Sequence, residues 1–133
     1  MRASDVVGVV AMAVFGIVAA SAAAGDLPGR RELKRADLDG ESGMEVITSV
    51  VVIRPGEVMP AHFHHGVETG YVLEGGRVAS EGKAEIELAT GAPLMNARGV
   101  VHGGFKVVSD APIRLVTVHV VDKGKPLYDG MKP

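Results

Sequence analysis

Three of the five histidines in this chain lie within four residues, at His62, His64 and His65. Alternate residues of a β-strand point to the same face, so the imidazoles of His62 and His64 are expected to project together. Glu68 follows after Gly66, a residue that lets the chain bend, and its carboxylate adds a third, negatively charged ligand. Imidazole and carboxylate groups bind divalent transition metals. The spacing of these side chains therefore predicts part of a metal site.

His102 is a further candidate ligand, although it lies far along the chain, shortly after a turn at Gly99. A β-barrel can bring its strand beside the first three ligands. A histidine pair alone favours a metal site only weakly, because buried histidines are usually satisfied by hydrogen bonds and surface histidine runs occur by chance. The pair, a glutamate four residues on and a distant histidine form a much more specific combination. We predict that His62, His64, Glu68 and His102 bind one metal ion.

Three imidazoles and one carboxylate suit Fe, Mn, Ni, Zn or Cu as a divalent ion, and this set of ligands does not select among them. Four protein ligands on a metal that accepts six leave two positions open for water, dioxygen or a chelating substrate. Zinc more often settles at four or five ligands.

Short strands and tight turns are indicated by the 18 glycines, the 7 prolines and the many valines of the chain. Strands are predicted at residues 44–53, 58–64, 69–74, 77–80, 84–88, 93–96, 100–108 and 113–121. The charged segment 30–43 shows no clear helical stripe and ends in a predicted loop. A series of short strands with frequent turns predicts an all-β sandwich or barrel. A closed or nearly closed barrel is favoured because it hides strand edges.

Residues 56–76 have the sequence GEVMPAHFHHGVETGYVLEGG, which resembles the first cupin motif. That motif is a glycine, five residues, H-x-H, three residues, a glutamate, six residues and a glycine. Gly56, His62, His64, Glu68 and Gly75 occupy every fixed position at the right spacing.

The second cupin motif is matched in part. It is a glycine, five residues, P-x-G, two residues, a histidine, three residues and an asparagine, and here Gly91, Gly99 and His102 match. Ala97 stands where proline is usual, and Lys106 stands where asparagine is usual. The departures leave the ligand set in place and affect the shape and polarity of the pocket beside it.

The resemblance covers residues 44–121 and implies an all-β, single-domain cupin-like β-barrel, also called a double-stranded β-helix or jelly roll, at residues 44–122. It also implies a homodimer and a small-molecule substrate. Dioxygenase chemistry is the leading activity within it, with Glu68 as a catalytic base that leaves the metal. A non-enzymatic metal- or ligand-binding module and a metal-dependent isomerase or lyase are the alternatives.

Four other polar side chains are candidates for the pocket or its rim. Lys106 would hold a carboxylate-bearing ligand if an unbroken strand placed it on the same face as His102, whereas a bulge at the two preceding glycines would turn it to solvent. Tyr71 either lines the pocket as a substrate-binding residue or packs on a strand. His65 is expected at the rim, and the pattern around His119 is too apolar on both faces to decide its direction.

The first residues resemble a secretory signal peptide. An uncharged run from Val6 is followed by Ala22-Ala23-Ala24, which predicts a signal peptide at residues 1–24 with cleavage after Ala24. The alternative is an uncleaved membrane anchor, which would be the only contact with a membrane. Either segment predicts a periplasmic or secreted domain, with an N-terminal linker and charged arm at residues 25–43 and an irregular C-terminal tail at residues 123–133.

Charge and cysteine content exclude several classes of function. The formal net charge is −2 and basic residues are not clustered, so no nucleic-acid partner is expected. The chain has no cysteine, which excludes disulfides, thiolate metal sites and a thiol nucleophile.

Overall fold

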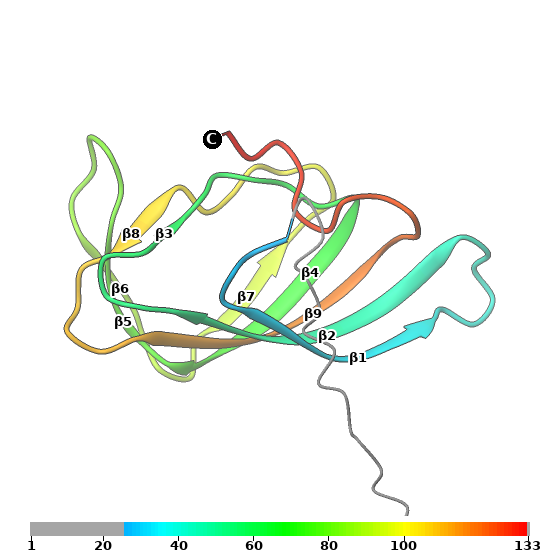
Figure 1. Ribbon diagram of the computed structural model, residues 1–133, viewed down its shortest axis with the longest axis horizontal. Helices are drawn as coiled ribbons and strands as arrows, with labels where there is room; N and C mark the ends of the chain where they lie inside the picture. Colours follow the sequence, from blue (N-terminus) through cyan, green and yellow to red (C-terminus); the bar gives the residue numbers. More distant parts are fainter. Residues whose placement is uncertain (1–25, 133) are drawn as a thin grey trace, which may run out of the picture.

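The computed structural model describes residues 26–132, which contain nine strands and no helix (Figure 1). The strands are β1 Arg30–Asp37, β2 Met44–Ile53, β3 Val58–Met59, β4 Gly66–Glu74, β5 Gly76–Ala79, β6 Ile86–Leu88, β7 Pro93–Asn96, β8 Phe105–Val107 and β9 Ile113–Asp122. Within the described residues, no helix is long and apolar enough to span a bilayer. The predicted signal peptide lies outside the described residues.

The strands form two antiparallel sheets. One has five strands in the order β1-β2-β9-β4-β7, and the other has four in the order β3-β8-β5-β6. Figure 1 shows β2, β9 and β4 running side by side through the middle of the molecule, with the β1–β2 hairpin projecting at one end and β5, β6 and β8 at the other. The all-β fold that the sequence predicts is therefore confirmed.

The central pair β2 and β9 shows why these sequences form strands. Both are rich in β-branched residues, and both alternate strictly between buried and half-buried or exposed side chains. The register Val51↔Leu115 and Ile47↔His119 places buried residues of the two strands side by side on the inner face of the sheet.

The hydrophobic core lies on the same inner face. Its buried members are Leu27, Val51, Ile53, Met59, Val72, Val78, Val107, Ile113, Leu115 and Tyr128. Toward one end of the barrel the buried residues become polar, and His64, Ser49, Thr117 and His119 are almost completely shielded from solvent. Buried polar side chains of this kind need partners, so this end of the barrel is the candidate site.

Two predicted strands are shorter than expected. Pairing stops after Met59 on β3 and begins at Phe105 on β8, although the two segments continue side by side. Gly103 and Gly104 both have positive φ angles, 79° and 69°, which is incompatible with a regular strand. The segments pair again at an isolated bridge between His62 and His102.

Strand β1 was not predicted from the sequence. Its residues RRELKRAD show no apolar alternation, because nearly every side chain is exposed. It is the edge strand of the five-stranded sheet and is held by antiparallel pairing with β2, with a register shift between Glu32 and Lys34. A highly charged edge strand also protects the sheet against pairing with other chains.

Candidate metal centre

The backbone brings His62 and His102 together directly. The N–H of His62 donates to the carbonyl of His102 at 2.9 Å, and the N–H of His102 donates to the carbonyl of His62 at 2.8 Å. The next residue, Gly103, passes so close that a Cβ there would lie 2.6 Å from the Pro60 carbonyl oxygen and 3.3 Å from His62 Cε1. Only glycine fits this approach, so the turn after His102 is what places the two imidazoles side by side.

Glu68 reaches the same point from the five-stranded sheet. On β4 it lies directly opposite Asn96 of β7 and His119 of β9. Asn96 Nδ2 donates a hydrogen bond to Glu68 Oε2 at 2.7 Å, and His119 Nε2 lies 3.4 Å from Oε1. Because directly opposed residues of antiparallel strands share a face, this row of three side chains is fixed by the sheet.

Three donor atoms converge at nearly equal distances. His64 Nε2 lies 3.1 Å from His102 Nε2 and 3.2 Å from Glu68 Oε2, and His102 Nε2 lies 3.1 Å from the same oxygen. Atoms bound at right angles about 2.1 Å from one metal ion are about 3 Å apart. These atoms thus have the separations of one face of a coordination octahedron, and a nitrogen of His62 lies within 4.8 Å of those of His64 and His102.

The outer nitrogen of each imidazole is held by a backbone carbonyl. His62 Nδ1 lies 2.7 Å from the Pro60 oxygen, His64 Nδ1 lies 2.5 Å from that of Leu127, and His102 Nδ1 lies 2.9 Å from that of Val100. A carbonyl only accepts, so we assign the proton of each neutral ring to Nδ1. This leaves the Nε2 lone pairs free, and metal-binding histidines are commonly oriented in this way.

Charge at the site follows from burial and from these contacts. Burial lowers the pKa of His62 to about 4, and it also lowers the pKa of His119. Burial alone would raise the pKa of Glu68, but the imidazoles of His102, His119 and His64 outweigh it and hold this pKa well below its usual range. Burial opposes the charged form of His102 as well, but its hydrogen bond with Glu68 prevails and raises its pKa.

Several hydrogen-bond acceptor atoms lie close together at this site, and their mutual repulsion shows whether a metal ion fits among them. With Nδ1 protonated, His64 and His102 point lone pairs at each other and at an ionised Glu68 oxygen across 3.1–3.2 Å. Such atoms repel one another unless a cation lies among them. A proton on His102 relieves one contact, whereas a divalent metal ion satisfies all three atoms together. The residues present therefore fit a divalent transition metal.

A cavity of about 160 Å³ opens beside these ligands. It is lined by Val51, Met59, His62, Glu68, Leu88, Leu94, Asn96, His102, Gly103, Phe105, Leu115, Thr117 and Tyr128. Its walls are mainly aliphatic and aromatic, with polar groups gathered on the side of the candidate metal. A small, largely apolar molecule with one polar end matches this lining.

The structure gathers the predicted ligands in two overlapping groups whose ligand atoms lie within 4.8 Å of one another, one of His62, His64 and His102 and one of His64, Glu68 and His119. It places two other predicted site residues elsewhere. Lys106 is exposed, because the glycine turn before β8 directs Phe105 and Val107 inward and Lys106 outward. Tyr71 is 48% exposed, on the opposite face of β4 from Glu68. Neither lines the cavity, so the predicted contacts of Lys106 and Tyr71 with a substrate in the cavity are corrected: both side chains face solvent.

The sequence left the direction of one site residue open and missed another. His119 is fully buried beside Glu68, and within residues 26–132 neither of its ring nitrogens has a hydrogen-bond partner. The pair Thr117 and His119, two polar residues on one face of an apolar strand, was the available signal. Tyr128 is 3% exposed and packs on His62 and His64. It follows a stretch with no regular pattern, and nothing in the sequence indicated its position.

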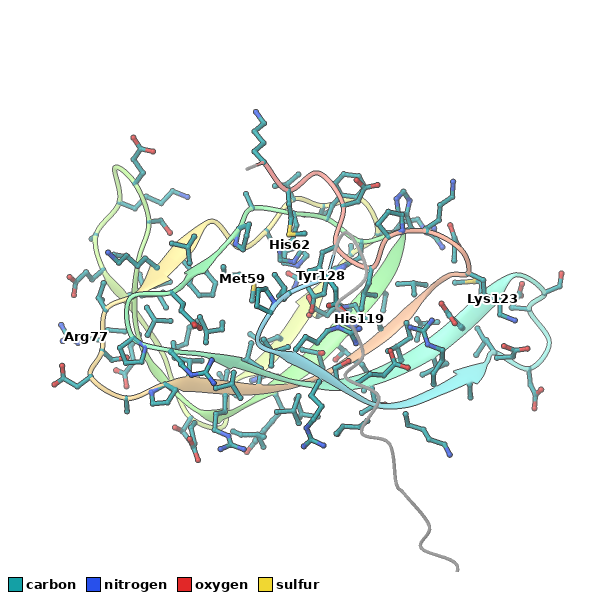
Figure 2. All side chains as sticks on the ribbon, in the orientation of Figure 1. Met59, His62, Arg77, His119, Lys123 and Tyr128 are labelled. Carbon is teal, nitrogen blue, oxygen red and sulfur yellow. The ribbon has the colours of Figure 1, made fainter. Side chains whose placement is uncertain are left out.

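Figure 2 shows His62, His119 and Tyr128 close together in the interior of the molecule, with Met59 nearby. They come from four separate segments: the end of β3, the following bridge, the last strand and the tail. The site thus depends on the complete barrel and on residues beyond its last strand.

The chain is similar to known proteins in sequence and in fold. The sequence model of the cupin domain family matches residues 49–119, more than half of the chain, and this range includes every candidate ligand. No curated protein sequence matches the chain significantly.

Solved structures with a similar fold include an uncharacterized conserved protein with a double-stranded β-helix domain from Klebsiella pneumoniae subsp. pneumoniae MGH 78578. The TM-score is 0.51 and the identity 18%, over 66% of this chain and 76% of that one. A cupin domain from Bordetella pertussis Tohama I matches at a TM-score of 0.48 and 20% identity, over 71% and 96% of the two chains. The DMSP lyase DddQ from Ruegeria pomeroyi DSS-3 matches at 0.48 and 21%, over 60% and 40%. The first of these likenesses shows the double-stranded β-helix fold.

Proposed function

The chain belongs to the cupin family, and we propose that it binds one divalent transition metal through His62, His64, Glu68 and His102 and acts on a small organic substrate in the adjoining cavity. The observation that carries the proposal is the convergence of the His64, His102 and Glu68 donor atoms within 3.1–3.2 Å of one another. Iron, manganese, nickel, zinc and copper are all compatible with three imidazoles and a carboxylate.

The leading reaction is a dioxygenation, in which both atoms of dioxygen enter the organic substrate and no external reductant is consumed. A bound metal would supply Lewis acidity and, if redox-active, electron transfer. Glu68 would take up a proton from the substrate at Oε1, the oxygen next to His119, while Asn96 keeps its hydrogen bond to Oε2. The aliphatic walls would keep water from the reacting groups.

The cavity limits the substrate class. A volume of about 160 Å³ is near that of an apolar cavity that accepts a benzene-sized molecule. Leu88, Leu94, Phe105 and Leu115 provide apolar walls, and the polar wall provides the metal ligands. We propose a substrate of about one ring in size, with vicinal or 1,3-related oxygens at one end that chelate the metal.

Metal content is the first test. Elemental analysis of protein purified without a histidine tag should find about one transition metal per chain, and added metal should raise the melting temperature of chelator-treated protein. His64→Ala and Glu68→Gln should abolish both effects, and Lys106→Met should change neither. Absence of metal, with no thermal response to any of the five ions, would refute the site.

Oxygen uptake separates the proposed enzyme from the alternatives. With acetylacetone or catechol as probes, a dioxygenase consumes one dioxygen for each substrate lost without added reductant. Substrate turnover without uptake indicates the isomerase or lyase. Tight metal binding without turnover indicates the non-enzymatic binding module.

We also propose that the protein is a homodimer paired through the outer face of the five-stranded sheet. Register places the outward residues of β2, β9 and β4 in continuous cross-strand rows: Val46–Val120–Val67, Thr48–Val118–Thr69 and Val50–Val116–Tyr71. Outward residues of a solvated sheet are usually polar, whereas most of these are apolar.

The extent of this face suits a second copy of the chain. Three strands about 4.8 Å apart and about five residues long cover roughly 15 Å by 17 Å, or about 250 Å² before side-chain relief. That area supports the apolar centre of a standard interface of about 800 Å² per partner, and two such sheets pack face to face at about 10 Å. The charged strand β1 would lie at its rim.

Export is proposed on the sequence of residues 1–24 alone. Expression of the full chain in a bacterium with two membranes should yield a periplasmic protein whose first residue is Gly25 by intact mass. A cytoplasmic protein of full-length mass would refute export, and a full-length protein in the membrane fraction would indicate the anchor.

A further inference from the structure

We propose that the carboxyl-terminal segment 127–129 is part of the metal centre. It positions His64, covers His62 and His64, and packs more tightly against them when metal is bound. This inference rests on the metal binding proposed above. It assigns a role to residues that follow the last strand and lie outside both cupin motifs.

The segment is joined to residues on both faces of the ligand-bearing chain. The Leu127 carbonyl accepts from His64 Nδ1 at 2.5 Å. Asp129 and Phe63 exchange reciprocal backbone hydrogen bonds of 2.9 and 3.0 Å, and the Asp129 carboxylate lies 2.8 Å from His65 Nε2. The inward residue His64 and the outward residues Phe63 and His65 are thus all held by one short segment.

Tyr128 lies between Leu127, which contacts His64, and Asp129, which contacts Phe63 and His65. Its ring centroid lies 4.8 Å from that of His62, 5.2 Å from His64 and 5.9 Å from His119, in edge-to-face arrangements. The side chain is 3% exposed and also lines the cavity. Tyr128 therefore packs against three imidazoles at once, each of them at most 3% exposed. Figure 2 shows Tyr128 beside His62 and His119.

His64 depends on this segment for its orientation. Its side chain is fully buried, and in the described part of the chain Leu127 provides the carbonyl that Nδ1 meets. Without that carbonyl a buried N–H is left unpaired, and the tautomer that presents Nε2 to the metal loses its advantage. Residues of this kind, which orient a metal ligand, typically change metal affinity by 10–100-fold.

The coupling acts in both directions. A metal on Nε2 withdraws electron density from the imidazole, which makes the Nδ1–H a stronger donor to Leu127. If docking of the segment increases the affinity for metal by some factor, bound metal increases the docking equilibrium constant of the segment by the same factor. We therefore expect the segment to open more often in the metal-free protein.

Hydrogen exchange on the unaltered full chain tests the coupling. Zinc should slow exchange of the amides of residues 127–130 by about tenfold or more relative to chelator-treated protein. The amides of β5 serve as the internal control and should change little, since no residue of β5 lines the cavity and the strand lies toward the other end of the barrel. Equal exchange at residues 127–130 with and without zinc would overturn the coupling.

Two full-chain variants test the positioning role with cobalt(II), whose visible spectrum reports its ligands. Asp129→Pro removes the N–H that donates to Phe63 and the carboxylate that meets His65, and Tyr128→Ala removes the ring. Each should weaken cobalt affinity by 10–100-fold and alter the spectrum. Asp122→Asn is the matched control, because it removes an exposed ion pair with Arg98 that is 2.8 Å long, as is the contact between Asp129 and His65. This variant should bind cobalt normally.

The outcomes separate this inference from the proposed function. If the unaltered chain binds neither cobalt nor zinc, metal binding itself is refuted and the coupling with it. If it binds them and both variants bind with unchanged affinity and spectrum, only the role of the segment is refuted. Circular dichroism of each metal-free variant establishes that the barrel is folded, and Tyr128→Phe, which keeps the ring, should retain affinity.

Discussion

Glu68 on β4 lies directly across from His119 on β9, with His119 Nε2 3.4 Å from Glu68 Oε1. The other carboxylate oxygen faces His64, His102 and Asn96. One oxygen of the carboxylate thus faces the candidate metal site, and the other faces a fully buried imidazole. His119 holds Glu68 in place, while its own nitrogens lack well-formed hydrogen bonds within the described residues.

His119→Leu should therefore stabilise the metal-free protein and weaken metal binding. A buried polar group without a partner costs about 1–3 kcal/mol, which an apolar residue of similar size does not incur. Loss of the imidazole also frees Glu68 to turn, so cobalt affinity should fall by about tenfold. Thermal melting of chelator-treated protein and cobalt titration measure the two effects. A destabilised variant with normal cobalt affinity would show that His119 only fills space.

Gly103→Ala should cost more than about 2 kcal/mol of folding free energy, because its Cβ would lie 2.6 Å from the Pro60 oxygen and its φ is +79°. Gly99→Ala is the matched control: its φ is +73°, but nothing lies within 4 Å of the new Cβ. The control should lose only about 1 kcal/mol. Urea denaturation of the two variants gives the difference, and equal losses would mean that the approach of Gly103 to the His62 segment is not tight.

The metal-free protein should lose stability as the pH falls from about 6.5 to about 4. His62 has a pKa of about 4 in the folded protein because it is buried, against 6.5 in its ordinary state. Over this range the unfolded chain binds a proton that folded His62 does not, so acid favours unfolding. The contribution is on the order of 2–3 kcal/mol. His119 adds to it, and His102, whose pKa is raised, opposes it.

Chemical denaturation at several pH values measures this slope. His62→Gln, without a titrating group, should flatten the curve between pH 6.5 and 4.5, above the range in which most carboxylates titrate. An unchanged slope in His62→Gln would show that other groups carry the acid sensitivity.

The sequence predicted the four candidate ligands because their positions follow from spacing within one segment and one turn. Strands β2, β7 and β9 were predicted to within about a residue because their side chains are rich in Val and Ile or bounded by glycine turns. Edge strand β1 was missed because exposed, charged residues carry no alternation. Its pairing depends on β2, a partner that no local pattern identifies.

The direction of individual side chains was less predictable than the strands. Counting residues along an unbroken strand put Lys106 on the face of His102, whereas the alternative left Lys106 turned to solvent by the two glycines before β8. The structure shows the second, with positive φ at both glycines. Tyr128 lies in the site because Asp129 bridges to Phe63, a contact between residues 66 positions apart. Such contacts are set by tertiary packing and leave no periodic trace in the sequence.

The outer face of the five-stranded sheet gives the last prediction. Val118→Lys places a charge in the middle row, where Val118 lies beside Thr48 and Thr69. If a second copy covers this face, the buried ammonium should dissociate the dimer, because an unpaired buried charge costs several kcal/mol. Ile86→Lys is the matched control: Ile86 is 59% exposed on β6 of the other sheet.

Light scattering coupled to size exclusion measures the mass of each variant. We expect a dimer for the unaltered chain and for Ile86→Lys, and a monomer for Val118→Lys. The inner face of β9 carries His119 and the outer face carries Val118, so the monomer should still bind cobalt with normal affinity. A Val118→Lys dimer of unchanged mass would show that the apolar rows are not the pairing surface. A monomeric unaltered chain would show that the face does not pair copies at all.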